Sequence, residues 1–259
     1  MVDESQPIEE DEEEYVAISM LVHGEEGVGK SWLGQSTPAP RLILDAEGGS
    51  KVPRRRFPDG RVVKQKKIKR DPVHERPPVD DGTWETCHVM VREYKDIDAA
   101  YAWLNAGDHP FRSVVIDSLT EVQKRCKDSI SGMDTPSERD WGLLLIKVEG
   151  LVRAFRDLTS HPQTPLDAVV VLALTMEKNG RRKAAVQGAL GVSLPGFVDL
   201  EGYMYVKDHE DGTSDRKLLI NPKDGFAAKD RTHVLSEEYG SVITNPDVEQ
   251  MLVVMNSEE

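Results

Sequence analysis

Short runs of consecutive apolar residues recur along the chain, separated by polar and glycine-rich segments. Such runs are typical of strands buried on both faces of a parallel sheet. The runs that we expect to form parallel strands cover residues 15–22, 41–45, 87–94, 113–118 and 168–175. Two shorter runs, residues 202–206 and 217–220, are expected to form late antiparallel strands.

Segments with helical spacing of apolar residues alternate with these runs. A short helix is expected to begin near Lys30 and to end before Pro38. Further helices are expected over residues 96–105, with an Asp96 cap, and over residues 119–129, 141–158 and 242–255. The alternation predicts an α/β fold with a mostly parallel central sheet, helices on both faces and ligands beyond the carboxyl ends of the strands.

Charge is distributed unevenly along the 259 residues, which carry a net charge of -13. Residues 1–14 contain eight acids and no base, which is typical of a disordered, solvated tail. Residues 51–70 contain ten Lys or Arg and one acid, and residues 51–83 are rich in charge, Pro and Gly, so we expect a weakly ordered basic insertion. Apart from this insertion, residues 15–259 are expected to form one α/β domain.

The composition excludes several classes of protein. No apolar stretch approaches the ~18 residues of a membrane span, and the acidic beginning differs from a secretory signal. Only Cys87 and Cys126 are present, without the spacing of metal ligands. We therefore expect a soluble, cytoplasmic protein (host cytoplasm for a phage protein) with no membrane partner, zinc site or disulfide framework.

A phosphate-binding motif follows the first expected strand. Residues 24–31 have the P-loop pattern Gly-x4-Gly-Lys-Ser, whose backbone N–H groups wrap phosphates. Lys30 is expected to reach the β- and γ-phosphates, and the Ser31 hydroxyl to ligate Mg²⁺. ATP and Mg²⁺ are therefore the predicted cofactors. The residues expected to contact nucleotide are Gly24, Glu25, Glu26, Gly27, Val28, Gly29, Lys30, Ser31 and Trp32.

Two acids at strand ends are candidates for the chemistry. Asp117 ends the run over residues 113–117, where a Walker B acid would orient Mg²⁺, although an acid there can also cap the next helix. Glu47 follows the strand over residues 41–45, where a carboxylate can activate the attacking water; the alternative is an exposed loop acid.

Several of these motifs resemble those of a known superfamily. Leu44-Asp45-Ala46-Glu47 and Val115-Ile116-Asp117-Ser118 look like the catalytic-glutamate and Walker B strand ends of RecA-like recombinases. Together with Asp140-Trp141-Gly142 and Lys229-Asp230-Arg231, they resemble the phage RecA-like ATPases of the Sak single-strand annealing group, over roughly residues 15–235.

The resemblance implies a RecA-like fold, ATP hydrolysis and a homo-oligomer. It also implies catalytic roles in trans for Lys229 and Arg231, which would reach a neighbouring subunit's ATP. Relatives place a polar γ-phosphate sensor at the end of the strand after Walker B, where Thr175 supplies a hydroxyl here.

The same resemblance suggests where nucleic acid would bind. In RecA-like proteins the loop after that strand faces DNA, and here it contains Lys178, Arg181, Arg182 and Lys183, with no aromatic residue between them. Such cations contact backbone phosphates without base specificity. The second candidate is Arg54-Arg55-Arg56 in the basic insertion, whose alternative is a solvated loop that pairs with the acidic tail.

The leading hypothesis is an ATPase of phage DNA recombination or annealing that binds single-stranded DNA, assembles as an oligomer and works with a single-strand-binding protein. A P-loop small-molecule kinase is the alternative within the enzymes, because a P-loop serves phosphoryl transfer as readily as hydrolysis. The third hypothesis is a non-hydrolysing binding module switched by nucleotide.

Overall fold

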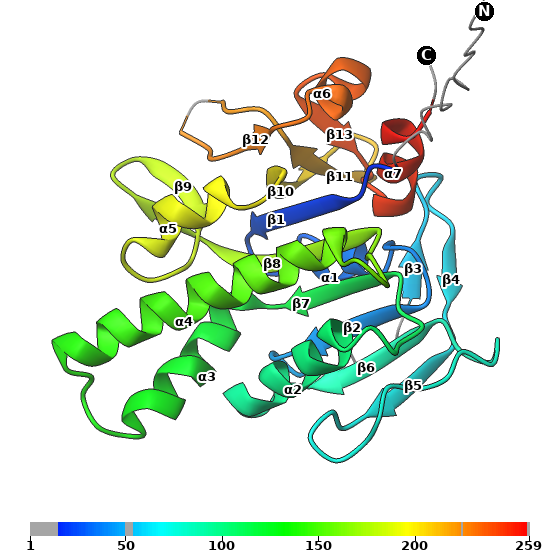
Figure 1. The fold of residues 1–259 in the computed structure, drawn as a ribbon. Helices are drawn as coiled ribbons and strands as arrows, with labels where there is room; N and C mark the ends of the chain where they lie inside the picture. Colours follow the sequence, from blue (N-terminus) through cyan, green and yellow to red (C-terminus); the bar gives the residue numbers. More distant parts are fainter. Residues whose placement is uncertain (1–14, 50–53, 224, 258–259) are drawn as a thin grey trace, which may run out of the picture.

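A central twisted sheet lies between two layers of helices in the computed structural model, which describes residues 15–49, 54–223 and 225–257 (Figure 1). The strand order is β13-β11-β10-β1-β8-β7-β2-β6-β5, with β12 also beside β10 and β9 beside β8. From β10 to β5 all neighbouring strands are parallel, whereas β11, β12 and β13 pair antiparallel. The predicted mostly parallel sheet with late antiparallel strands is confirmed.

The strands and helices have the following bounds. The strands are β1 (Ile18–Gly24), β2 (Arg41–Asp45), β3 (Arg54–Arg56), β4 (Val62–Lys64), β5 (Lys67–Arg70), β6 (Thr86–Met90), β7 (Ser113–Asp117), β8 (Ala168–Lys178), β9 (Arg181–Ala184), β10 (Leu200–Asp208), β11 (Ser214–Leu219), β12 (Lys229–Asp230) and β13 (Val242–Thr244). The α-helices are α1 (Lys30–Gly34), α2 (Tyr94–Asn105), α3 (Leu119–Ser131), α4 (Glu138–Asp157), α5 (Leu190–Ser193), α6 (Val234–Tyr239) and α7 (Val248–Met255).

Each face of the sheet has its own hydrophobic core. On one face, Ile97 of α2, Val122 of α3 and Phe155 of α4 pack with the strands. On the other, Leu33 of α1, Leu235 of α6 and Met251 of α7 do so. These six side chains are almost fully buried, so helices cover both faces as predicted.

Helix ends are where the structure departs from the predicted bounds. The helix expected over residues 242–255 is wrong in its first part, because 242–244 form β13 and α7 begins only after Pro246, with Asp247 as its N-cap. Helix α2 is capped by Glu93, and Asp96 supplies the other half of that capping box.

The expectation of weak order in the basic insertion is wrong for residues 54–70. The first part forms the β3–β4 hairpin, and β5 pairs parallel with β6 at the edge of the main sheet. The partly buried Ile68 of β5 packs against the hydrophobic core. Residues 51–53 of the insertion, like the predicted acidic tail 1–14, lie outside the described residues.

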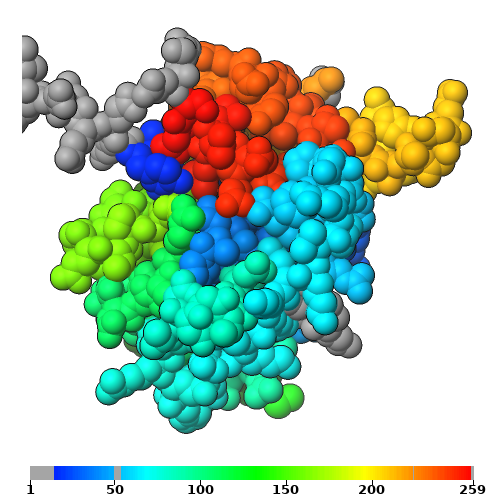
Figure 2. Space-filling view, turned by 90° about the vertical axis from the view of Figure 1, so that its right-hand side faces the viewer, coloured from blue at the N-terminus to red at the C-terminus, as the bar shows by residue number. Residues whose placement is uncertain are grey.

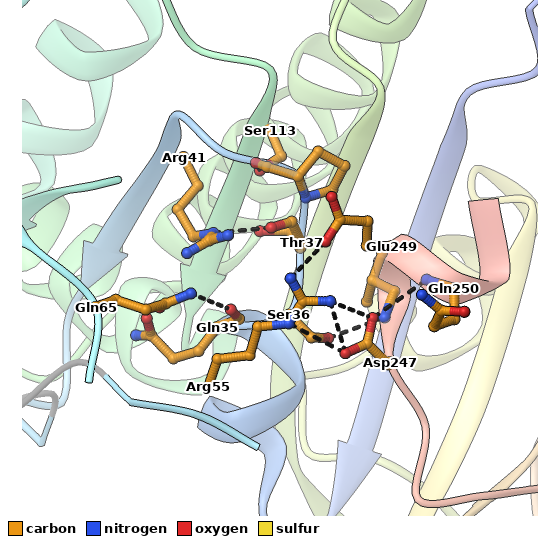
Figure 3. A network of polar contacts seen from close by, with 12 residues as sticks. Gln35, Ser36, Thr37, Arg41, Arg55, Gln65, Ser113, Asp247, Glu249 and Gln250 are labelled. Atoms are coloured by element: carbon orange, nitrogen blue, oxygen red, sulfur yellow. Dashed lines mark hydrogen bonds and ion pairs between the residues drawn. The ribbon is translucent and has the colours of Figure 1, made fainter. Parts of the chain in front are cut away.

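A polar network fastens this insertion to the body (Figure 3). The Arg55 guanidinium donates to both carboxylate oxygens of Asp247, at 2.9 Å from Nη2, and also pairs with Glu249 on α7. Gln65 Nε2 donates to the Gln35 carbonyl at 3.3 Å. Figure 2 shows the red C-terminal helix against this cyan segment of the insertion.

Candidate nucleotide-binding and active site

A cleft of about 650 Å³ lies beyond the carboxyl ends of β1, β2 and β7, the edge at which α/β folds bind ligands. It gathers residues from the P-loop, from the loops after β2 and β7 and from α3. The lining residues are Glu26, Gly27, Gly29, Lys30, Ser31, Trp32, Ala46, Glu47, Asp117, Thr120, Glu121, Lys124, Arg125 and Leu174. Ser31 and Asp117, 86 residues apart in the sequence, are thus brought to one place.

Neighbouring strands approach the P-loop so closely that two of its positions require glycine. A Cβ added to Gly24 would lie 2.5 Å from the carbonyl oxygen of Met204 on the neighbouring strand. Gly29 has φ +106°, and a Cβ there would lie 2.4 Å from Arg216 Nε. The loop therefore wraps tightly against β10 and β11, with its backbone free of side chains at these points.

Lys30 is held beneath the loop. Its Nζ donates to the carbonyls of Gly24, at 2.9 Å, and Glu25, at 2.7 Å. Burial lowers the pKa of Lys30, whereas the nearby Glu47 and Asp117 carboxylates raise it. The ammonium is therefore positioned at the phosphate-binding loop, near the predicted general base Glu47 and the predicted metal ligand Asp117.

The predicted magnesium ligands lie in direct contact. Ser31 Oγ donates to Asp117 Oδ2 at 2.6 Å. Burial raises the pKa of Asp117 to about 6, with the negative charges of Glu47 and Asp45 adding to the rise and the Ser31 hydrogen bond opposing it. A hydroxyl and a carboxylate are hard oxygen ligands, so this pair fits Mg²⁺ bound with a nucleotide. When bound, the ion neutralises charge on phosphate oxygens.

Glu47 is exposed in the same cleft, which leaves its carboxylate accessible to water. Its Oε1 accepts a hydrogen bond of 2.5 Å from Ser118 Oγ, the residue after Asp117. Ser118, directly after β7, thus orients the carboxylate from the end of the neighbouring strand. The role of Glu47 as general base remains a prediction.

Thr175 does not line this cleft, contrary to the sensor prediction. Its Oγ1 lies 2.5 Å from His23 Nδ1, so the hydroxyl is engaged with β1. Leu174 lines the cleft from this strand. Successive residues of a strand point to opposite faces, which separates the threonine from the cleft by one position.

Lys229 and Arg231 contact their own chain. Lys229 Nζ donates to the carbonyls of Pro195 and Val198, the latter at 2.6 Å. Arg231 Nη2 donates to the Gly196 carbonyl at 2.6 Å. Both cations thus bind carbonyls of residues 195–198, and neither lines the cleft of its own chain. Their action in trans stays a prediction.

Helix α3 supplies three charged residues that the sequence reasoning missed. Glu121, Lys124 and Arg125 line the cleft, and the acid pairs with the two cations at 2.9 and 3.3 Å. Their i, i+3 and i+4 spacing places them on one face. The sequence contained a signal for these residues, because the first turns of a helix that follows Asp117 must lie close to the site.

The candidate DNA-binding cations occupy different environments. Lys178, Arg181, Arg182 and Lys183 belong to a β8–β9 hairpin and not to an irregular loop. Its turn is Asn179-Gly180, with φ of 54° and 72°, the sequence favoured in tight hairpins. The hairpin thus presents its cations on paired strands.

Of the three consecutive arginines 54–56, only Arg54 is exposed. Arg55 is committed to the carboxylates on the C-terminal segment described above. The Arg56 guanidinium lies 5.1 Å from the centroid of the Trp32 ring, directly after the P-loop. Two of the three therefore have intramolecular partners, which argues against this triplet as a single nucleic-acid contact.

Within the described ranges, no helix has the length and apolar character needed to cross a membrane. The same ranges contain no group of three or more His, Cys, Asp or Glu residues suited to a metal. The Ser31–Asp117 pair would therefore hold Mg²⁺ together with phosphate oxygens and water, as P-loop sites do.

Comparisons with known proteins place the chain in a family. No curated protein matches the sequence. Among solved structures, a prototypical ATPase from the type III secretion system of pathogenic bacteria matches with a TM-score of 0.43 and 12% identity. The match covers 91% of this chain and 59% of the secretion ATPase, so this chain spans about three-fifths of the length of that protein. The model of the AAA domain matches residues 17–232. This chain belongs to the AAA domain family of P-loop ATPases.

Proposed function

We propose that this protein is a Mg²⁺-dependent ATPase of phage-type DNA recombination or annealing, which binds single-stranded DNA and assembles as a homo-oligomer. The observation that carries the hydrolytic part is the convergence of Lys30, Ser31, Asp117 and Glu47 on one cleft. A P-loop cation, a hydroxyl–carboxylate pair and a water-accessible carboxylate are the parts that ATP hydrolysis requires.

The roles follow from the contacts. Lys30 stabilises negative charge on the transferred phosphoryl group, and Ser31 and Asp117 hold the metal. Glu47, oriented by the Ser118 hydroxyl, accepts a proton from the attacking water.

Nucleic-acid binding is supported by the cationic β8–β9 hairpin, which stands out in a chain with a net charge of -13. Four cations on one hairpin favour sequence-independent, salt-sensitive contact with phosphates. Oligomerisation rests on the resemblance of Lys229-Asp230-Arg231 to a trans-acting element. In an oligomer, these cations would complete a neighbour's site and make hydrolysis depend on assembly.

The experiment is steady-state ATP hydrolysis with and without a single-stranded oligonucleotide at low salt. Lys30→Ala should abolish turnover, and Glu47→Gln should reduce it by about a hundredfold or more while nucleotide binding persists. Glu210→Gln, which changes an exposed carboxylate that does not line the cleft, is the matched control. Hydrolysis that ignores DNA, with no oligonucleotide binding, would refute the recombination role; equal turnover in Glu47→Gln would refute the assigned base.

A further inference from the structure

An aromatic groove of about 410 Å³ lies beside the cationic hairpin and is lined by residues of β9, β10, β11 and β13. It is apolar within and has cations at its edge. Its lining residues are Arg182, Tyr203, Tyr205, Leu219, Lys223, Phe226 and Val242. They come from five segments of the chain, so no local sequence motif predicts the groove.

Three aromatic rings pack together in the groove and differ in how far they are exposed. Tyr203 and Tyr205 stack with an interplanar angle of 15° and centroids 5.8 Å apart. Phe226 lies 4.6 Å from Tyr203, centroid to centroid. Tyr203 is almost fully buried, whereas Tyr205 and Phe226 are partly exposed. The outer two rings therefore present faces on which another planar ring can stack.

Cations accompany these rings. The Arg182 guanidinium lies 5.2 Å from the Phe226 centroid and within 3.5 Å of the Tyr203 hydroxyl, and Lys223 is exposed at the edge. A second cleft, of about 530 Å³, continues the charge along the hairpin with Lys178, Arg181 and Lys183. A polyanion with planar bases matches this combination of aromatic and cationic groups.

The backbone fixes the platform relative to the hairpin. Arg182 N donates to the Gly225 carbonyl at 2.7 Å, and Ala227 N donates to the Arg182 carbonyl at 2.9 Å. A Cβ on Gly225 would lie 2.6 Å from the Gly180 carbonyl oxygen, so the two loops are in van der Waals contact. The aromatic residues of the groove and the cations of the hairpin are therefore held in a fixed relative position by backbone hydrogen bonds.

We infer that this groove is the base-stacking site of the single-stranded nucleic acid, in which bases lie on Tyr205 and Phe226 while phosphates contact Arg182 and Lys223. The inference rests on the proposed function and deepens it, because phosphate contacts alone had been assigned to the hairpin. Stacking on aromatic faces is tolerant of sequence, since every base has a π-face.

Two probes separate stacking from charge. Fluorescence anisotropy would measure binding of a thymidine oligonucleotide and of an abasic oligonucleotide with the same number of phosphates, at low salt, with ATP and Mg²⁺ present. Tyr205→Leu and Phe226→Leu should each weaken binding of the thymidine probe by about fivefold or more, and should leave the abasic probe unaffected. Tyr205→Phe should bind as the wild type does.

Tyr15→Leu, at a tyrosine that is 51% exposed and far from the groove in sequence, is the matched control and should change neither affinity. Thermal unfolding followed by circular dichroism would verify the fold of every variant. Unchanged binding of the thymidine probe in both leucine variants would refute the groove as a base-stacking site. Equal losses of affinity for the two probes would refute it as well.

Two further outcomes would also overturn the groove. If the leucine variants change the size of the oligomer in light scattering but keep oligonucleotide affinity, the groove is a subunit contact. If the wild type binds neither probe, the nucleic-acid part of the proposed function fails as well, whereas ATP hydrolysis in the absence of DNA tests the ATPase separately.

Discussion

Replacement of Arg55 by Met tests whether the basic insertion is held to the body by charge. The Arg55 side chain is 11% exposed and that of its partner Asp247 is 0% exposed. Met preserves much of the aliphatic volume but leaves a buried carboxylate without its bidentate partner, which costs about 3–5 kcal/mol. Burial already raises the pKa of Asp247 and the arginine opposes that rise. The loss should therefore be largest near pH 8 and shrink towards acid pH, where Asp247 takes up a proton.

The assay is urea unfolding followed by circular dichroism at several pH values. Arg54→Met, an exposed neighbour on the same hairpin, should change the free energy of unfolding by no more than about 0.5 kcal/mol. If Arg55→Met unfolds at the wild-type urea concentration but loses oligonucleotide affinity, the arginine serves nucleic acid and the structural reasoning is refuted.

Three further predictions concern the cleft. Asp117→Asn should raise the free energy of unfolding at pH 8, without Mg²⁺ or nucleotide, by about 1–3 kcal/mol, because the Asp117 pKa of about 6 means that ionisation destabilises the folded state. The gain should vanish below pH 4, where the carboxyl is protonated in both states. A pH-independent difference in urea unfolding would contradict this cause. Arg125→Gln should weaken ATP binding by about tenfold in a fluorescent-nucleotide titration, since it removes a cleft cation, whereas the exposed Arg139→Gln should not. Equal affinities would remove Arg125 from the site. Lys30→Ala mixed with Arg231→Ala should recover ATP hydrolysis that neither variant has alone if subunits share sites; no recovery in the mixture would exclude the trans role.

The parallel strands and the P-loop were predictable because their determinants are local. A run such as Val114-Val115-Ile116 can be buried only between two helical layers, and Gly27, Gly29 and Lys30 carry their geometry in their own spacing. The position of an acid at a strand end also follows, because parallel strands end at the same edge of a sheet. For that reason Glu47 and Asp117 were placed in the cleft without knowledge of the fold.

Features that depend on distant partners were not predictable. Lys67–Arg70 reads as a cationic loop, and only its pairing with β6 makes it a strand. Tyr205 and Phe226 read as scattered aromatic residues until β10 and the 223–226 turn bring them to Arg182. Local patterns carry no information on which segments meet, and the aromatic partners of the cationic hairpin were therefore missed.

Strand β1 lies between β10, which lines the groove, and β8, which lines the cleft. The register pairs Gly24 with Leu174 and Met204, while the preceding His23 is buried against the Tyr203 ring at 5.4 Å.

Burial lowers the pKa of His23 to about 4, so the ring is neutral; its Nε2 donates to the Ala227 carbonyl at 3.0 Å, and its Nδ1 accepts from Thr175 Oγ1. One histidine thus joins the loop beside the groove to the strand that lines the cleft, directly before the P-loop. Stimulation of ATP hydrolysis by DNA is therefore a stricter test of the connection than DNA affinity, because affinity requires only the groove whereas stimulation requires communication between the two sites.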